Sequence, residues 1–286
     1  MQKSTALILL VPLILAFYFV YVAIGWNVAV SFTDWKGLLP SYNFVGFAQY
    51  GALFSAPMFW QSLANNLILL LIIPGSIGLG LLLAILLDQK IRGAGVFRTI
   101  YLLPFALSFV VTATMWAWMY DPNKGIINAL LKSIGLGSLA GGSLLSQSGT
   151  VMLAIIIAII WQFSGYTMVV LLAGIKSVPQ NQINAAKIDG SSGFRLYRKV
   201  VIPQLKVPIL TAFVILMIFA LKTFDLIWVL TKGGPSYASF TLPIMLYWEA
   251  FTYKSNFAYG AAVGNILLLV VLLIVVPYMY RSYRRR

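Results

Sequence analysis

The sequence contains neither cysteine nor histidine among its 286 residues. This absence excludes disulfides, thiolate metal sites, cysteine nucleophiles and imidazole ligands. Acidic residues are also scarce, and the six present are Asp34, Asp88, Asp121, Asp189, Asp225 and Glu249. With so few candidate bases and ligands, we expect no independent hydrolytic site and no metal site in this chain.

Charged residues of both signs make up only 9% of the chain, whereas hydrophobic residues make up 61% and the mean hydropathy is +0.92. A soluble domain carries about 25% charged residues. The segments that connect the long apolar runs are too short to form a separate globular core. We therefore expect a single transmembrane domain that occupies residues 1–286.

Six apolar segments are each long enough to cross a bilayer, whose hydrocarbon core of about 30 Å needs about 20 helical residues. They are residues 5–32, 61–87, 99–120, 149–175, 207–231 and 256–280. Only the fifth contains charged residues, Lys222 and Asp225. The first is much longer than the apolar part of a cleaved signal peptide, so we expect a retained anchor helix. The sequence thus predicts an all-α membrane protein with six transmembrane helices.

Basic residues are distributed unequally between the two ends of these segments. If the N-terminus is cytoplasmic, fourteen of the twenty Lys and Arg residues lie on the cytoplasmic side. The five on the outer side are Lys36, Lys124, Lys132, Lys232 and Lys254. Positive charge of membrane proteins concentrates in cytoplasmic loops. We therefore expect both termini in the cytoplasm, and we interpret the net charge of +14 as a sign of orientation rather than of a nucleic-acid partner.

The connection between the third and fourth segments begins with a turn signal at residues 121–125, which include Pro122 and Gly125. Residues 126–134 then repeat apolar side chains at helical spacing, which predicts a short helix on the outer membrane surface. Residues 135–149 are rich in Gly and Ser, so we expect a loop there.

The longest cytoplasmic connection, residues 176–206, contains the signals of two short helices. Pro179 suits the start of a helix over Gln180–Ile188, and Gly190 suits the position just after its end. A second helix is expected over Gly193–Val200, capped by the preceding serines, Ser191 or Ser192. Such a surface can dock a partner protein, although a basic loop resting on anionic lipid headgroups is an alternative interpretation.

The motifs in this connection resemble the EAA loop of bacterial ABC-importer permeases. Asn184-Ala185-Ala186 is followed at the family's spacing by Gly190, Val200 and Ile202-Pro203. Further resemblance to the sugar-permease branch, first-subunit type, lies in three other stretches: Tyr101-Leu102-Leu103-Pro104, Trp116 to Asn128, and Phe224 to Thr231 followed by Gly233-Gly234-Pro235. Four motifs in the right order make this resemblance specific.

The resemblance implies a six-helix type I importer fold in which the EAA loop is a coupling helix that fits a groove of an ATP-hydrolysing subunit. The residues it assigns to this contact are Asn184, Ala185, Ala186, Asp189, Gly190 and Pro203. Asn184 replaces the family's acidic residue, so docking here would lack that ion pair. ATP and Mg²⁺ would bind to the partner subunits, because Gly174-Ile175-Lys176-Ser177 lacks the spacing of a phosphate-binding loop.

Polar and aromatic side chains inside the fourth and fifth segments are the candidates for a substrate site, since polar groups within a membrane usually face a cavity or a partner. We select Gln162, Tyr166, Phe219 and Thr223. Gln162 and Tyr166 are four residues apart and share one helix face, as do Phe219 and Thr223. The resemblance also places these two segments around the central cavity. Plain packing is the alternative for each residue. Lys222 and Asp225 could pair with each other, meet a binding protein or close an outer gate.

The resulting hypothesis is a multi-pass cell-membrane subunit that imports a sugar, polyol or oligosaccharide without being an enzyme itself. Its expected partners are a second permease subunit, two ATP-binding subunits and an extracytoplasmic solute-binding protein. The small residues Gly260 and Gly264 are assigned to the contact with the second permease. A self-sufficient carrier or channel and a membrane enzyme or scaffold are the rival hypotheses. The absence of a visible internal repeat argues against the carrier.

Overall fold

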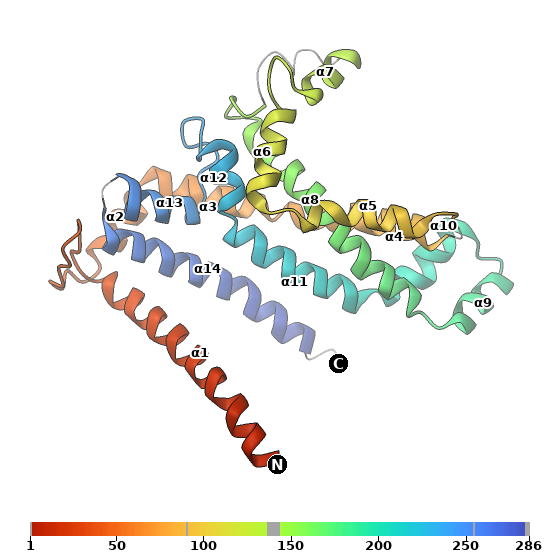
Figure 1. Cartoon of the computed structure of the whole chain (residues 1–286), viewed down its shortest axis with the longest axis horizontal. Helices are drawn as coiled ribbons and strands as arrows, with labels where there is room; N and C mark the ends of the chain where they lie inside the picture. Colours follow the sequence, from red (N-terminus) through yellow and green to blue (C-terminus); the bar gives the residue numbers. More distant parts are fainter. Residues whose placement is uncertain (1, 90, 136–143, 254, 284–286) are drawn as a thin grey trace. The chain divides into compact units, whose positions relative to one another are not determined.

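The computed structural model describes residues 2–89, 91–135, 144–253 and 255–283, and these residues form helices joined by turns, with one isolated β-bridge between Thr33 and Phe44 (Figure 1). The chain divides into two compact units. The first contains residues 1–63 and 241–286, and the second contains residues 64–240. The expected loop at residues 135–149 lies largely outside the described residues.

The first unit is built on two long apolar helices. Its elements are α1 (Gln2–Val30), α2 (Ala48–Ser55), the start of α3 (Pro57–Leu69), α13 (Leu242–Tyr247), the π-helix η3 (Trp248–Tyr253) and α14 (Phe257–Tyr283). Within this unit α14 packs against α1, α2 and α13. The large apolar side chains of α1 from Leu10 to Val28 are exposed, as expected of a helix that faces lipid.

A chain of hydrogen bonds holds α1, α2 and α14 together within the apolar surroundings of the first unit. The Asn27 amide donates to Asn265 Oδ1 at 2.7 Å, and the Asn265 amide donates to the Tyr50 hydroxyl at 3.0 Å. The hydroxyls of Tyr50 and Ser31 lie 2.8 Å apart. Each polar group thereby has a partner, which removes the cost of placing it in an apolar environment.

The assignment of Gly260 and Gly264 to a second permease subunit is wrong, because residues of the same chain occupy this face. A Cβ atom on Gly260 would lie 2.8 Å from Ala250 Cβ, and one on Gly264 would lie 3.1 Å from Leu246 Cδ1. Small side chains indicate where two helices approach closely, and here they allow α13 and η3 to lie against α14.

The second unit surrounds the straight helix α8 (Val151–Lys176), which packs against α4, α5, α6 and α11 (Figure 1). The unit's elements are the end of α3, α4 (Ile72–Asp88), α5 (Ala94–Ala106), α6 (Phe109–Met119), α7 (Ile126–Ser133), α8, α9 (Gln180–Ile188), α10 (Gly193–Leu196), the π-helix η1 (Tyr197–Val201), the 3₁₀ turn η2 (Ile202–Gln204), α11 (Lys206–Lys222) and α12 (Asp225–Thr231). The short helix expected at residues 126–134 is present as α7, and its position on the membrane surface stays a prediction.

Glycines permit the close approach of α8 to α4 and α5. A Cβ atom on Gly80 of α4 would lie 2.1 Å from Thr167 Oγ1, and one on Gly165 of α8 would lie 1.9 Å from the Tyr101 carbonyl oxygen of α5. Thr167 also donates a 2.7 Å hydrogen bond to the Ser76 carbonyl. The backbone of α8 therefore meets the backbone of α5 at Gly165, and the backbone of α4 meets the Thr167 side chain at Gly80, close contacts of the kind that small residues allow between membrane helices.

Among the residues that the structure describes, four helical segments are long and apolar enough to cross a membrane, and two bent helix pairs bring the candidates to as many as six. The four are Leu10–Val30, Pro57–Asp88, Val151–Lys176 and Phe257–Pro277, which coincide with the expected first, second, fourth and sixth segments. The structure differs in the other two. Residues 99–120 lie in α5 and α6, which are bent by 100°. The second bent pair joins Gly193–Gln204 to Lys206–Lys222 at 70°, so the expected fifth segment begins with α11 just after a bend and continues into α12 after a break at Thr223 and Phe224.

The connection of residues 176–206, in which the coupling helix is expected and which is called the coupling segment below, contains two helical pieces. The first, α9, has the expected bounds and ends in a Schellman motif, in which Gly190 has φ of +79°. The Ser191 amide donates to the Ala186 carbonyl at 2.9 Å, and the Gly190 amide to the Lys187 carbonyl at 3.0 Å. The second piece differs from the expectation, since α10 has only four residues before η1, and Ser192 caps it without a side-chain hydrogen bond.

Candidate functional site

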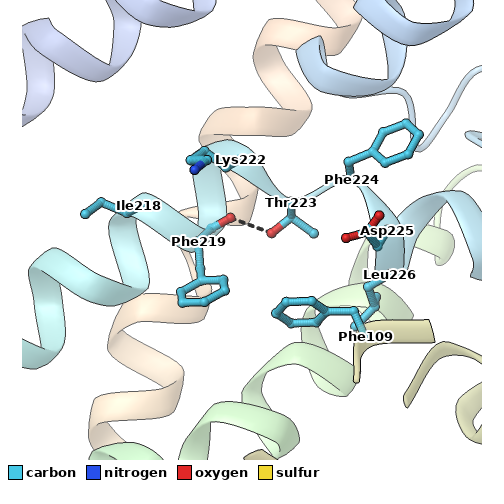
Figure 2. Close-up of a pocket in the computed structure, with 8 residues that line it drawn as sticks. All are labelled: Phe109, Ile218, Phe219, Lys222, Thr223, Phe224, Asp225 and Leu226. Atoms are coloured by element: carbon cyan, nitrogen blue, oxygen red, sulfur yellow. Dashed lines mark hydrogen bonds between the residues drawn. The ribbon is translucent and has the colours of Figure 1, made fainter. Parts of the chain in front are cut away.

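The break between α5 and α6 and the break between α11 and α12 line the same pair of cavities. Two cavities, of about 220 and 310 Å³, share Phe109, Phe219 and Asp225 in their linings. Figure 2 shows Phe109 and Phe219 on one side of the smaller cavity, near Thr223. Helix ends within membrane-spanning segments commonly form binding sites, because unwound backbone and polar side chains meet there.

A side chain from α8 compensates for the break between α5 and α6. Pro104 lies within α5, which ends at Ala106, and the next residue, Leu107, is extended, with ψ of 145°. The Gln162 amide donates a 3.0 Å hydrogen bond to the freed Leu107 carbonyl. Ser108 then begins α6, and its hydroxyl accepts a hydrogen bond from the Val111 amide. The break is thus held in a defined geometry.

The break between α11 and α12 is compensated in the same way. The Thr223 hydroxyl donates to the Phe219 carbonyl, as Figure 2 shows, and the buried Asn66 amide donates to the Leu221 carbonyl at 3.2 Å. Both carbonyls would otherwise lack partners at the end of α11. Unwound backbone is tolerated at membrane depth only where such partners exist.

The structure brings together three of the four residues selected as a substrate site. Gln162 lines the larger cavity, Thr223 lines the smaller one and Phe219 lines both. Tyr166 lines neither cavity, because its ring stacks on Phe105 with a centroid distance of 5.1 Å and an interplanar angle of 25°. Since Phe105 lines the larger cavity, Tyr166 packs against a lining residue without lining the cavity itself.

Four lining residues at the end of α5 and the start of α6 were not among the residues expected from the sequence. They are Phe105, Leu107, Ser108 and Phe109. Pro104 followed by Ser108 is the signal that could have located them, because a proline and a capping residue four positions later indicate one helix end and one helix start.

The cavity lining combines apolar rings with unused hydrogen-bonding capacity. Phe219 lies 4.7 Å from Phe163 and 5.6 Å from Phe109 between ring centroids. Gln162 Oε1 is buried and has no hydrogen-bond partner among the described residues, although the amide nitrogen donates to the Leu107 carbonyl. A buried acceptor without a partner costs free energy, which a ligand hydroxyl could recover. This arrangement suits a neutral molecule with apolar faces and hydroxyl groups.

Lys222 and Asp225 are exposed side chains at the smaller cavity. The structure assigns no ion pair between them among the residues it describes, and Figure 2 shows the Lys222 ammonium turned away from the Asp225 carboxylate. The expectation that they pair with each other is therefore not met. A role in contacting a binding protein or in an outer gate stays a prediction.

The expected docking surface is presented by the outward face of α9. Asn184, Ala185 and Asp189 are exposed, Ala186 is half-buried and Gly190 follows the helix end. Asn184 Oδ1 accepts a hydrogen bond of 3.2 Å from the Gln180 amide. Nearby, Ile188 and Phe194 are 87% and 70% exposed. Pro203 lies exposed in η2.

An apolar cluster fixes the coupling segment to the ends of α4 and α8. Its buried members are Leu83, Ala84, Leu87, Met168, Leu171, Leu172, Ile175, Val178, Val201 and Leu205. Ile183 of α9 and Tyr197 of η1 pack against this cluster. Because these side chains are closely packed, the segment is held against both long helices rather than joined to them by loops alone.

The comparison with protein-family models decides the identity of this fold. Residues 75–286 match the model described as the binding-protein-dependent transport system inner membrane component. The chain belongs to this family of permeases. It is therefore a multi-pass membrane protein of a binding-protein-dependent ABC importer, and as a permease it is a transport subunit rather than an enzyme or a self-sufficient carrier.

Relatives of this permease cover nearly its whole length. A probable ABC transporter permease of Pyrococcus horikoshii is 58% identical over 279 residues, which cover 97% of this chain and 95% of that protein. The xylose/arabinose import permease of Haloferax volcanii is 40% identical and covers 96% of this chain and 86% of its own length.

Among solved structures, a bacterial alginate ABC transporter in complex with an alginate pentasaccharide-bound periplasmic protein contains a chain that matches this permease with a TM-score of 0.84. The match covers 99% of this chain and 95% of that chain, at 22% sequence identity. This similarity confirms the expected permease fold.

Proposed function

We propose that this permease translocates a sugar, or a related polyol or oligosaccharide, into the cytoplasm. The observation that carries the proposal is the cavity at the two helix breaks, where Phe109 and Phe219 offer ring faces and Gln162 offers a buried acceptor without a partner. Sugars present CH surfaces that pack on aromatic rings and hydroxyls that form hydrogen bonds. The import of xylose and arabinose named for the Haloferax relative supports this substrate class.

The transport complex would contain this chain, a second permease subunit, two ATP-binding subunits and a solute-binding protein. ATP and Mg²⁺ would bind only to the ATP-binding subunits. Docking of one such subunit on Asn184, Ala185 and Ala186 would push or pull the apolar cluster at the ends of α4 and α8. Since α8 also carries Gln162, its movement would alter the cavity and so couple ATP hydrolysis to alternating access.

The substrate class is tested by measuring ATPase activity and uptake in proteoliposomes that contain the complete complex. The panel of binding-protein ligands should include pentoses, disaccharides, longer oligosaccharides, amino acids and metal ions. We expect a neutral sugar to give the largest stimulation. Stimulation by amino acids or metal ions in place of sugars would overturn the proposed function.

Replacing Phe219 with leucine is expected to lower the maximal uptake rate about 2- to 10-fold at saturating loaded binding protein. The change removes a ring face from both cavities, and aromatic contacts contribute about 0.5–1.5 kcal/mol beyond their burial. The control is Phe97→Leu, since Phe97 is exposed on α5 and lines neither cavity. Equal uptake by both variants would contradict a role for Phe219 in the substrate path.

A further inference from the structure

A side-chain hydrogen bond joins the coupling segment to the end of α4. The Tyr197 hydroxyl in η1 donates to Asp88 Oδ2 at 2.7 Å, across 109 residues of sequence. Asp88 is the last residue of α4, and Tyr197 follows α10 directly. Of the two halves of the coupling segment, the one that contains η1 is thus tied to a membrane helix by a directional contact.

The position of Asp88 is unfavourable for the helix that carries it. A carboxylate at a helix C-terminus faces the negative end of the helix dipole, which destabilises the helix. Within the part of the chain that the structure describes, the Asp88 carboxylate accepts one side-chain hydrogen bond, from the Tyr197 hydroxyl, and forms no ion pair. Stabilisation of α4 therefore does not explain an acid at this position, whereas the bond to Tyr197 does.

The bond lies at the edge of the apolar cluster that anchors the coupling segment. Leu87, next to Asp88, and Val201, at the end of η1, are buried members of this cluster, and the Tyr197 ring packs against it. Burial and the neighbouring Asp88 carboxylate raise the pKa of Tyr197, so its hydroxyl remains a donor at neutral pH. A hydrogen bond to a charged acceptor is also stronger than a neutral one.

The bond sits in a π-helical turn, where the regular α-helical hydrogen bonding is interrupted. Such turns occur frequently at functional sites, because they reorient one side chain without ending the helix. Here the wider turn lies between α10 and η2 and includes Tyr197 as its first residue. The backbone of the segment is thus irregular at the residue that makes the contact.

We propose that Tyr197 and Asp88 form a positioning pair that transmits movement of the docked coupling segment to α4. This inference rests on the proposed function, because it assumes that an ATP-binding subunit docks on α9. Apolar contacts can slide, whereas a short hydrogen bond resists displacement of η1 along the axis of α4. From α4 the displacement reaches α8 through the Thr167–Ser76 bond and the close contact at Gly80, and α8 carries Gln162 at the cavity.

The test is Tyr197→Phe in the complete reconstituted complex, assayed with the loaded binding protein that best stimulates the wild type. The ring still packs on the cluster, and only the hydroxyl is lost. We expect normal copurification of the ATP-binding subunits and normal basal ATPase activity, with binding-protein-stimulated ATPase activity and uptake lowered about 10-fold, the size of effect given by losing a hydrogen bond to a charged group.

Variants at the partner residue separate positioning from simple stability. Asp88→Leu should reproduce the loss, the double variant should show no further loss, and Asp88→Asn should retain part of the stimulation because its amide oxygen still accepts from Tyr197. Tyr18→Phe, at an exposed position of α1, is the matched control. Wild-type stimulation in Tyr197→Phe, or additive losses in the double variant, would overturn the pair.

This outcome can be told apart from a failure of the proposed function. If the wild-type complex responds to sugars but Tyr197→Phe responds equally well, the positioning pair is wrong and sugar import stands. If the wild type responds only to a different ligand class, the sugar proposal is wrong, and the comparison of Tyr197→Phe with wild type is made with that ligand.

Discussion

An Ala185→Glu permease is expected to lose its ATP-binding subunits during purification and to show no ATP-driven uptake. Ala185 is exposed on the face of α9 that lies away from Ile183, which packs on the anchoring cluster. The substitution therefore leaves the folded core of the permease unchanged. It adds a charged side chain where the proposed partner groove must approach the helix closely, and a buried charge without a partner costs several kcal/mol. Each 1.4 kcal/mol lost lowers affinity about tenfold, so an affinity loss of more than 100-fold is expected.

The measurement is the ratio of ATP-binding subunit to permease after affinity purification, combined with uptake in proteoliposomes. Ala129→Glu is a matched control, because Ala129 is an exposed alanine on the short helix α7, far from the coupling segment in sequence. We expect this control to retain both the subunits and transport. Full association of the Ala185→Glu permease would rule out α9 as the docking helix.

Gly165→Ala is expected to destabilise the permease more than other single-methyl additions in the second unit. The added Cβ atom would lie 1.9 Å from the Tyr101 carbonyl oxygen and 2.9 Å from Leu102 Cα, which are both backbone atoms. No change of rotamer relieves such contacts, so α5 must move away from α8. Overpacking of this kind costs about 1–3 kcal/mol, and more where the backbone cannot yield. The displacement also pulls Leu107 away from Gln162 and opens the break that the Gln162 amide closes.

Thermal unfolding of the detergent-solubilised complex, together with uptake, measures both consequences of Gly165→Ala. The control is Gly78→Ala on α4, because a Cβ at Gly78 has no neighbour within 4 Å and alanine favours helix by about 1 kcal/mol. We expect the control to match or exceed wild-type stability. If the two variants unfold at the same temperature, the close contact between α5 and α8 is not a feature of the folded protein.

The local features of the coupling segment were predictable from the sequence because they depend on neighbouring residues. The bounds Gln180–Ile188 follow from Pro179 before the helix and Gly190 after it, and the structure has both in those positions. The second piece was less predictable. The π-turn begins at Tyr197, whose hydroxyl bonds to Asp88 of α4, 109 residues away in the sequence, and no capping or turn residue near Tyr197 predicts it.

The substrate site was predictable only in part. Gln162, Phe219 and Thr223 stood out as polar or aromatic residues inside apolar segments, and they line the cavities. Tyr166 lines neither cavity, because its ring packs on Phe105, which lies in a different helix. The residues at the start of α6 line the cavity because α5 and α6 are separated by a break, and Gln162 of α8 donates a hydrogen bond to the Leu107 carbonyl at that break.

Hydrophobic length and the capping residues by themselves determined an all-α, multi-pass protein with short helical pieces between its fourth and fifth apolar segments, because these properties act along the chain or over one helical turn. Tertiary structure alone decided which helices break, which carbonyls Gln162 and Asn66 satisfy, and that Gly260 and Gly264 face residues of their own chain. The physical reason is that an apolar environment requires every polar group to find a partner, and that partner is supplied by whichever helix packs nearby.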